Sequence, residues 1–221
     1  MEDDTHCSKR FLTLATVFFW FFLTGEGFGH DVSVVDLSAG SGCSQDQLAA
    51  YLNVSAAVIQ YFTGLSTDFP VHIILYPQGS AFQKNGFPAW AAGVCREGVI
   101  HLRNPRLLLK KNILLNVVSH EFLHAVIHFH ELGLPSWFEE GLAAFLFPRS
   151  DSQFDPEHSP MVEGGYPSDI PTLRLYYSWS THLFQSLFPR NEPEKLRTFL
   201  SDCQKKGFDE PFRSLMEGKR K

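Results

Sequence analysis

Residues 111–130 read KNILLNVVSHEFLHAVIHFH, and this stretch has the most regular helical pattern of the chain. Its apolar residues recur at the spacing of one helix face: Leu114, Val117, Val118, Phe122, Ala125 and Val126. Gly133 and Pro135 follow closely and predict where the helix ends. The pattern therefore predicts a helix over residues 111–130 whose apolar face is buried.

The predicted helix contains the pattern H-E-x-x-H, from His120 to His124. Because residues four apart lie on one face of a helix, the two imidazoles can bind one metal ion together. Glu121 follows the first histidine and can reach a water molecule on that metal. The pattern predicts a zinc (Zn2+) site with His120 and His124 as ligands and Glu121 as general base. The alternative is a core helix whose histidines hydrogen-bond to neighbouring residues.

A catalytic zinc site needs three protein ligands and an open position for water. One candidate for the third ligand is a carboxylate, Glu139 or Glu140, on a second helix predicted just downstream. The other is His130, which is placed as in the metzincin pattern H-E-x-x-H-x-x-G-x-x-H. That pattern requires glycine where this chain has Ile127, which favours continuation of the helix. The sequence thus favours a carboxylate as the third ligand.

Further elements are predicted on both sides of these two helices. Upstream, the sequence predicts a Gly/Ser-rich linker over 31–43, a helix over 45–62 capped by Ser44, a buried strand over 71–76, and a hairpin over 87–102. Downstream, it predicts the second helix over 137–147 capped by Ser136, a loop over 149–171, and closing helices over 172–188, 194–205 and 209–216. This order predicts an α+β domain with a small sheet before the metal helix.

The two motifs together resemble a known family. HEFLH at 120–124, followed by LPSWFEEGLA at 134–143, is similar to the gluzincin metallopeptidases, and more narrowly to the peptidase MA-like group of small zinc-peptidase domains. The resemblance covers roughly residues 70–216. It implies a zincin-like (thermolysin-like) single domain, in which a small N-terminal sheet with a hairpin precedes the metal-binding helix and the C-terminal helices. It also implies that Glu140, directly before the glycine of W-x-x-E-G, is the third ligand.

The resemblance further implies a zinc-dependent peptidase that hydrolyses peptide bonds of a peptide or protein substrate. Glu121 would be the general base, and Tyr177 would stabilise the oxyanion, with Tyr176 and His182 as alternatives. Residues 91–94 are a candidate edge strand that pairs with an extended substrate. The competing interpretation is a catalytically silent zinc-binding domain, structural or interaction-mediating, derived from a peptidase.

Composition and the N-terminal sequence lead to expectations about the number of domains, the partners and the location of the protein. The 221 residues, 44% hydrophobic and 19% charged, suit one globular domain, and a net charge of −5 without a basic stripe argues against a nucleic-acid partner. The uncharged run 11–23 after Lys9-Arg10 predicts that residues 1–27 are a signal peptide or a membrane anchor. We therefore expect export (secreted or periplasmic) or membrane association through residues 11–23. Residues 28–69 are expected to be a linker and helix, and 70–218 the peptidase domain.

Overall fold

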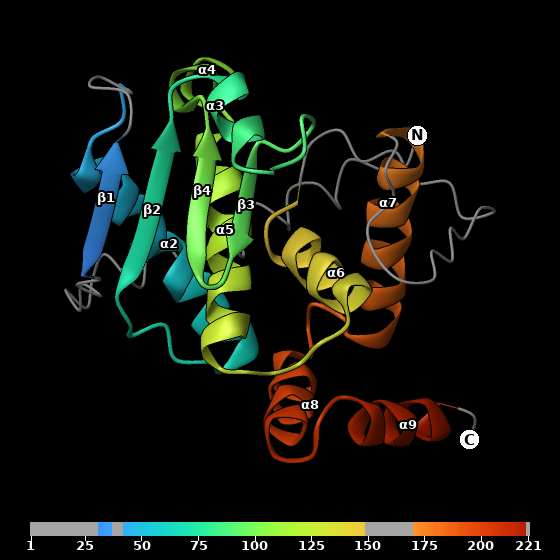
Figure 1. Cartoon of the computed structure of the whole chain (residues 1–221). Helices are drawn as coiled ribbons and strands as arrows, with labels where there is room; N and C mark the ends of the chain where they lie inside the picture. The colour runs from blue at the N-terminus through green and yellow to red at the C-terminus, as the bar shows by residue number, and fades with distance from the viewer. Residues whose placement is uncertain (1–30, 37–41, 149–169, 220–221) are drawn as a thin grey trace, which may run out of the picture.

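The computed structural model describes residues 31–36, 42–148 and 170–219 (Figure 1). The predictions for the N-terminal segment 1–27 and for nearly all of the loop 149–171 fall outside these ranges. Within them, no helix combines the length and the apolar character that crossing a membrane requires.

A four-stranded sheet occupies the N-terminal half. Its strands are β1 (Val32–Asp36), β2 (Val71–Tyr76), β3 (Gly93–Arg96) and β4 (Val99–Arg103), in the order β1-β2-β4-β3. The strands β1, β2 and β4 run parallel, whereas β3 is antiparallel to β4 and lies at the edge of the sheet. The predicted buried strand and the predicted hairpin are therefore confirmed.

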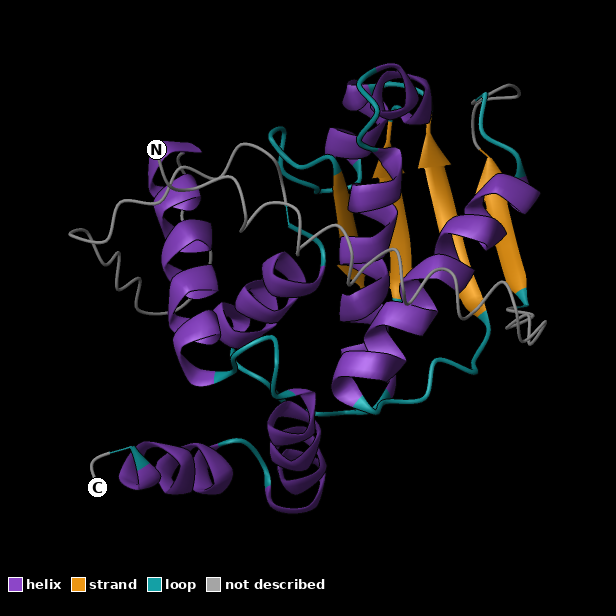
Figure 2. Ribbon diagram, turned by 180° about the vertical axis from the view of Figure 1, so that it is seen from behind, coloured by secondary structure: helices purple, strands orange, loops and turns teal. Residues whose placement is uncertain are grey.

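Helices cover one face of this sheet and extend past its β3 edge. They are α2 (Gln45–Thr63), α3 (Gly79–Lys84), α4 (Pro105–Lys110), α5 (Leu114–Phe129), α6 (Ser136–Leu146), α7 (Ile170–Leu187), α8 (Pro193–Lys206) and α9 (Asp209–Gly218). Helices α2 and α5 pack on the same face of the sheet (Figure 2), and α6 and α7 stand beside its β3 edge. The mixed α+β class predicted from the sequence is confirmed.

The core forms between the sheet and the two covering helices. Val71, Ile73 and Leu75 alternate along β2 and are fully buried, as the period of a strand requires. From α5, Phe122 and Val126 enter the same core and are also fully buried. This packing places α5 along the edge of the sheet, next to β3.

Two predictions near the sheet are wrong. The helix with the H-E-x-x-H pattern was predicted to begin at residue 111, but Asn104 caps a separate short helix, α4, with its side chain accepting a hydrogen bond from Leu107 N at 3.2 Å. The metal helix therefore begins at Leu114 and not at residue 111. Residues 31–43 were expected to be a linker, but 32–36 form β1, because the segment gains a complete ladder of hydrogen bonds beside β2.

Candidate metal centre

Helix α5 is oriented by a buried polar contact next to the first histidine. The hydroxyl of Ser119 hydrogen-bonds to that of Ser55 on α2, with an Oγ–Oγ distance of 2.7 Å. Rotation of α5 would break this buried pair, and such breaks are costly away from water. As a result His120 and Glu121 point away from solvent, with exposed fractions of 4% and 6%.

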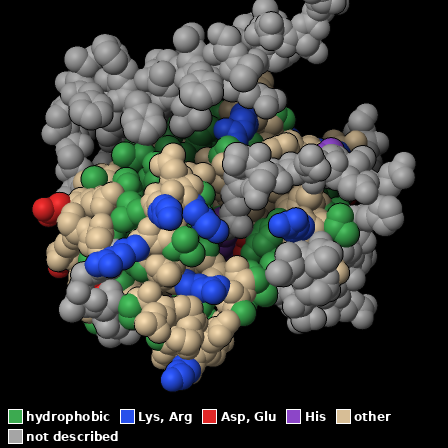
Figure 3. Space-filling model, turned by 90° about the horizontal axis from the view of Figure 1, so that it is seen from above, with side chains coloured by type: hydrophobic (Ala, Val, Ile, Leu, Met, Phe, Trp, Pro, Cys, Tyr) green, Lys and Arg blue, Asp and Glu red, His purple; other side chains and the backbone are tan. Residues whose placement is uncertain are grey.

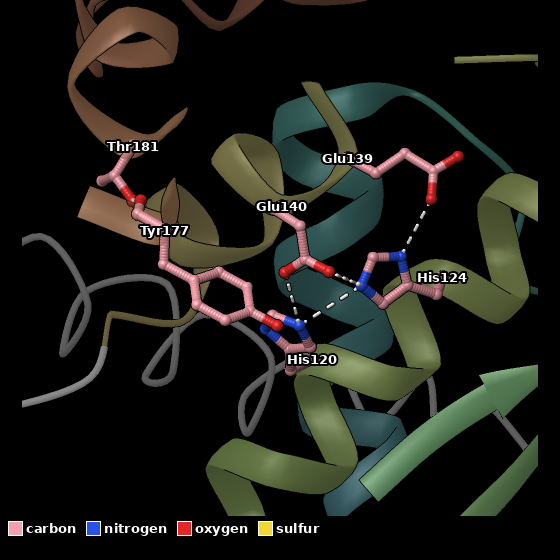
Figure 4. A network of polar contacts seen from close by, with 6 residues as sticks. All are labelled: His120, His124, Glu139, Glu140, Tyr177 and Thr181. Atoms are coloured by element: carbon pink, nitrogen blue, oxygen red, sulfur yellow. Dashed lines mark hydrogen bonds and ion pairs between the residues drawn. The ribbon is translucent and has the colours of Figure 1, made fainter. Parts of the chain in front are cut away.

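The side chains of His120, His124 and Glu140 converge on one point (Figure 4). The Nε2 atom of His120 lies 3.1 Å from Glu140 Oε2 and 3.2 Å from His124 Nε2. His124 Nε2 lies 3.5 Å from Glu140 Oε1. A tetrahedral zinc ion with bonds of about 2.1 Å holds its donor atoms roughly 3.4 Å apart. The donor atoms are therefore close enough together to hold a metal ion.

Among the described residues, the candidate metal site has three donor residues. Across the described ranges, the only group of three or more His, Cys, Asp or Glu residues able to hold a metal is His120, His124 and Glu140. Structural zinc sites generally close the tetrahedron with four protein ligands, whereas catalytic sites use three. Three donors leave one coordination position for a water or a substrate atom.

The alternative third ligand, His130, lies away from this point. Ile127 continues α5 as expected, and His130 follows the last helical residue as its C-cap. Its Nε2 donates a hydrogen bond to the carbonyl oxygen of Ser66 at 2.8 Å. His130 is therefore engaged with the loop after α2 and is not part of the cluster.

Next to Glu140, helix α6 lies very close to α7. A Cβ atom at Gly141 would lie 2.5 Å from the carbonyl oxygen of Ser180 and 2.8 Å from Phe184 Cβ, so only glycine permits this approach. Pro135 is the N-cap of α6, and Ser136 is its first helical residue. The expected cap at Ser136 is therefore wrong, because the helix begins one residue earlier than predicted.

The neighbouring carboxylate, Glu139, contacts His124 on the side of the ring that faces away from the cluster. Its Oε2 accepts a hydrogen bond from His124 Nδ1 at 3.1 Å, on the ring edge opposite to the donor atom Nε2 (Figure 4). Such contacts fix the tautomer and orientation of ligand histidines. Among the described residues, no hydrogen-bond partner is found for the buried Nδ1 of His120. The resemblance implied Glu140 as the third ligand, and Glu140 is the glutamate that lies in the cluster, whereas the contact of Glu139 with His124 was not predicted.

The charges of the cluster favour binding of a cation. Burial alone would raise the pKa of Glu140, but His120 and His124 outweigh it and hold this pKa well below its ordinary value. Burial lowers the pKa of His124, but the contacts with Glu140 and Glu139 outweigh it and raise this pKa well above 6.5. In the metal-free protein, the negative charge of Glu140 is therefore balanced by a proton on the neighbouring histidines. A metal ion can displace this proton.

Glu121 lies beside the cluster without being one of its donors. A Cβ atom at Gly93, the first residue of β3, would lie 2.9 Å from Glu121 Cγ and 3.2 Å from Glu121 Oε1. The absent side chain of Gly93 thus makes room for the carboxylate between α5 and the edge strand. The sequence analysis did not identify this role of Gly93, which only the packing of β3 on α5 reveals.

Of the three candidate oxyanion donors, Tyr177 is the one that faces the cluster. Its ring lies 6.5 Å from the ring of His120, centroid to centroid, and points toward it (Figure 4). Tyr177 also lines the cleft, whereas Tyr176 and His182 do not. Tyr176 is buried and His182 is exposed. The structure therefore places Tyr177 beside the candidate metal centre.

A cleft of about 1800 Å³ opens onto the metal centre. Its lining includes the edge strand β3, then His120, Glu121 and His124 of α5, Glu140 of α6, and Tyr177 of α7. Pockets for drug-sized ligands usually measure about 300–1,000 Å³, so this cleft has room for an extended chain.

Comparisons with known proteins add no relative: no protein-family model, curated protein or solved structure matches the chain. The function must therefore be argued from the site.

Proposed function

We propose that the protein is a zinc-dependent peptidase of the gluzincin type, with the zincin-like (thermolysin-like) arrangement of its α+β domain. The metal ligands are His120, His124 and Glu140, whose donor atoms have the spacing of a tetrahedral zinc site. The arrangement of an edge strand, a metal-binding helix and a second helix carrying the carboxylate supports this assignment.

The observation that carries the proposal is the position of Glu121. This carboxylate is nearly buried, lines the cleft, and stands beside the cluster without completing it. A metal site that only stabilises the fold has no use for an additional buried carboxylate, because burial of an uncompensated charge is unfavourable. A carboxylate next to an open metal position is the arrangement of a general base in metal-assisted hydrolysis.

Each residue then has a distinct role. A zinc ion bound at this site supplies a Lewis acid that activates water and polarises a carbonyl group. Glu121 accepts a proton from the attacking water and transfers it to the leaving amine. The Tyr177 hydroxyl donates a hydrogen bond to the oxyanion that forms on the substrate. Glu139 is a positioning residue, because it acts only through His124.

The substrate we propose is an extended peptide or protein segment. The outer edge of β3 is not paired with another described strand, and residues of β3 line the cleft. A peptide can add to such an edge through main-chain hydrogen bonds, which places its backbone along the metal centre. Export, or attachment to a membrane through residues 11–23, remains a sequence-based prediction alongside this proposal.

The test is a comparison of Glu121→Gln with the wild type. Zinc content is measured by metal analysis, and hydrolysis is measured with a mixed library of internally quenched peptides. We expect the variant to keep its zinc and to lose at least about 100-fold in rate, as for loss of a general base. Glu131→Gln, which changes an exposed carboxylate of the same cleft, is the control and should retain activity.

Two results would contradict the proposal. If Glu121→Gln hydrolysed peptides as fast as the wild type, Glu121 would not be the base. If the wild-type protein bound zinc and cleaved no peptide of the library, the catalytically silent zinc-binding domain would be the better description. Tyr177→Phe adds a finer test, since loss of an oxyanion donor lowers kcat by about 100- to 1,000-fold.

A further inference from the structure

The segment that leads into the metal helix has a charge opposite to that of the protein as a whole. Between Gly98 and His120 the chain contains four basic residues, Arg103, Arg106, Lys110 and Lys111, and no Asp or Glu, although its net charge is −5. In the structure this segment forms β4, α4 and the turn before α5. Positive charge is therefore concentrated at one end of the molecule.

Much of this charge is exposed and not neutralised. Arg106, Lys110 and Lys111 are exposed, and no ion pair within the described part of the chain involves them. Leu107 and Ile113 lie among them and are also exposed, by 43% and 36%. We call these five residues the α4 patch.

The apolar side chains of this region are as unusual as its charge. Three of the six exposed large apolar side chains in the described residues fall within 107–115: Leu107, Ile113 and Leu115. Single apolar side chains scattered over a surface need no explanation, but a cluster usually marks a contact site. Figure 3, which looks onto the α4 end, shows Lys and Arg side chains spread over this face with hydrophobic side chains between them.

We propose that the α4 patch binds the surface of an anionic phospholipid bilayer. The basic side chains are attracted to anionic headgroups, while Leu107 and Ile113 enter the boundary between headgroups and acyl chains. A stable protein partner is a poorer fit, because such interfaces bury about 800 Å² on each side and use roughly 20–30 residues. The patch is much smaller, whereas a few cations and apolar side chains are sufficient for reversible binding to a bilayer.

The α4 patch lies next to the cleft that contains the candidate metal centre. Leu107, Lys111 and Ile113 also line the end of the cleft next to α4. A bilayer at the α4 patch would therefore lie against the mouth of the cleft and bring the metal centre close to the membrane surface. The inference rests on the charge and exposure of the α4 patch and does not depend on peptidase activity.

The experiment is co-sedimentation of the full chain with vesicles of phosphatidylcholine, with and without phosphatidylserine, at physiological ionic strength. Each of the three cations near an anionic surface contributes roughly a five-fold gain in binding, so together we expect up to about 100-fold tighter binding to the anionic vesicles. The triple variant Arg106→Glu, Lys110→Glu, Lys111→Glu should lose this preference. Leu107→Ser with Ile113→Ser should weaken binding to the anionic vesicles several-fold.

The matched control reverses the same number of basic residues on α8 and α9: Lys195→Glu, Lys205→Glu, Arg213→Glu. This variant should keep the preference for anionic vesicles, and circular dichroism checks that every variant is folded. Every variant contains the apolar run 11–23, so any contribution of this run to vesicle binding is the same in all of them. Equal binding to both kinds of vesicle, or the same loss in the control, would overturn the proposal. So would binding to a poly-glutamate peptide with no binding to vesicles, which would indicate an acidic protein partner.

Discussion

Helices α5 and α6 both contribute side chains to the candidate metal centre, but different kinds of contact position them. On α5, His120 and His124 are one helical turn apart, so their proximity follows from helix geometry alone. On α6, Glu140 comes from a separate helix that packs on both α5 and α7, and the adjacent Gly141 permits the close approach to α7. The comparison teaches that two donors are set locally and the third by tertiary packing, and the predictions below test this difference.

The largest effect is expected from removing one donor on each helix. His124→Ala and Glu140→Ala should each lower zinc affinity by more than the roughly 10- to 100-fold that loss of an outer partner costs, because each removes a metal bond. Titration with a competing chelator measures the affinity. His128→Ala, one turn beyond His124 and exposed, is the control and should keep it within about two-fold. Wild-type affinity in Glu140→Ala would show that α6 supplies no ligand.

A methyl group at the α6–α7 contact should separate the two helices. Gly141→Ala places a Cβ atom 2.5 Å from the backbone oxygen of Ser180. Overpacking typically costs about 1–3 kcal/mol, and we expect the upper end because the clash involves backbone. Urea unfolding measures the stability. Gly218→Ala, where a Cβ atom would meet nothing within 4 Å, is the matched control and should not destabilise the protein. Equal stability of Gly141→Ala and wild type would refute the close approach.

The contact from α6 back to α5 is the next to test. Glu139→Ala removes the acceptor of His124 Nδ1 and should lower zinc affinity about 10- to 100-fold. Glu139→Gln should lose less, because its amide oxygen can still accept the hydrogen bond. Glu131→Ala serves as the control for a nearby exposed carboxylate. If Glu139→Gln and Glu139→Ala lowered zinc affinity equally, the negative charge of Glu139 would be its important contribution, and not the orientation that it gives His124.

The smallest effect is expected from pH, which acts on the charges shared by the two helices. His124 has a raised pKa and must lose its proton to bind zinc, so affinity should increase up to about tenfold per pH unit above neutrality. In the metal-free protein, the contacts that raise the pKa of His124 stabilise the fold fully below pH 6.5. This contribution is lost as pH rises through the folded-state pKa. The contacts that lower the pKa of Glu140 stabilise the fold above pH 4.5, and this stabilisation is lost as the pH falls through the folded-state pKa. Zinc affinity independent of pH in calorimetric titrations would contradict this coupling.

Several features of the fold were predictable because their signals are local. The apolar spacing of residues 114–126 predicted α5, and the short β-branched apolar run 71–76, closed by Pro77, predicted β2. Other features were not predicted. Strand β1 pairs with β2 in parallel and was missed because the stretch 31–43 was interpreted as Gly/Ser-rich, although Val32, Val34 and Val35 are β-branched. Helix α4 was hidden because Asn104-Pro105 can either end a strand or begin a helix, and the two outcomes have the same sequence signature.

The sequence by itself determined the proximity of His120, Glu121 and His124, since residues within one helical turn are neighbours whatever surrounds the helix. It also predicted the order of the longer helices around them, but not the short helix α4. Only the tertiary structure decided that Glu140 faces the two Nε2 atoms while Glu139 faces His124 Nδ1, and that Gly93 makes room for Glu121. Those relations join segments far apart in the chain. They depend on how closely the helices and the edge strand can approach, which no local spacing encodes.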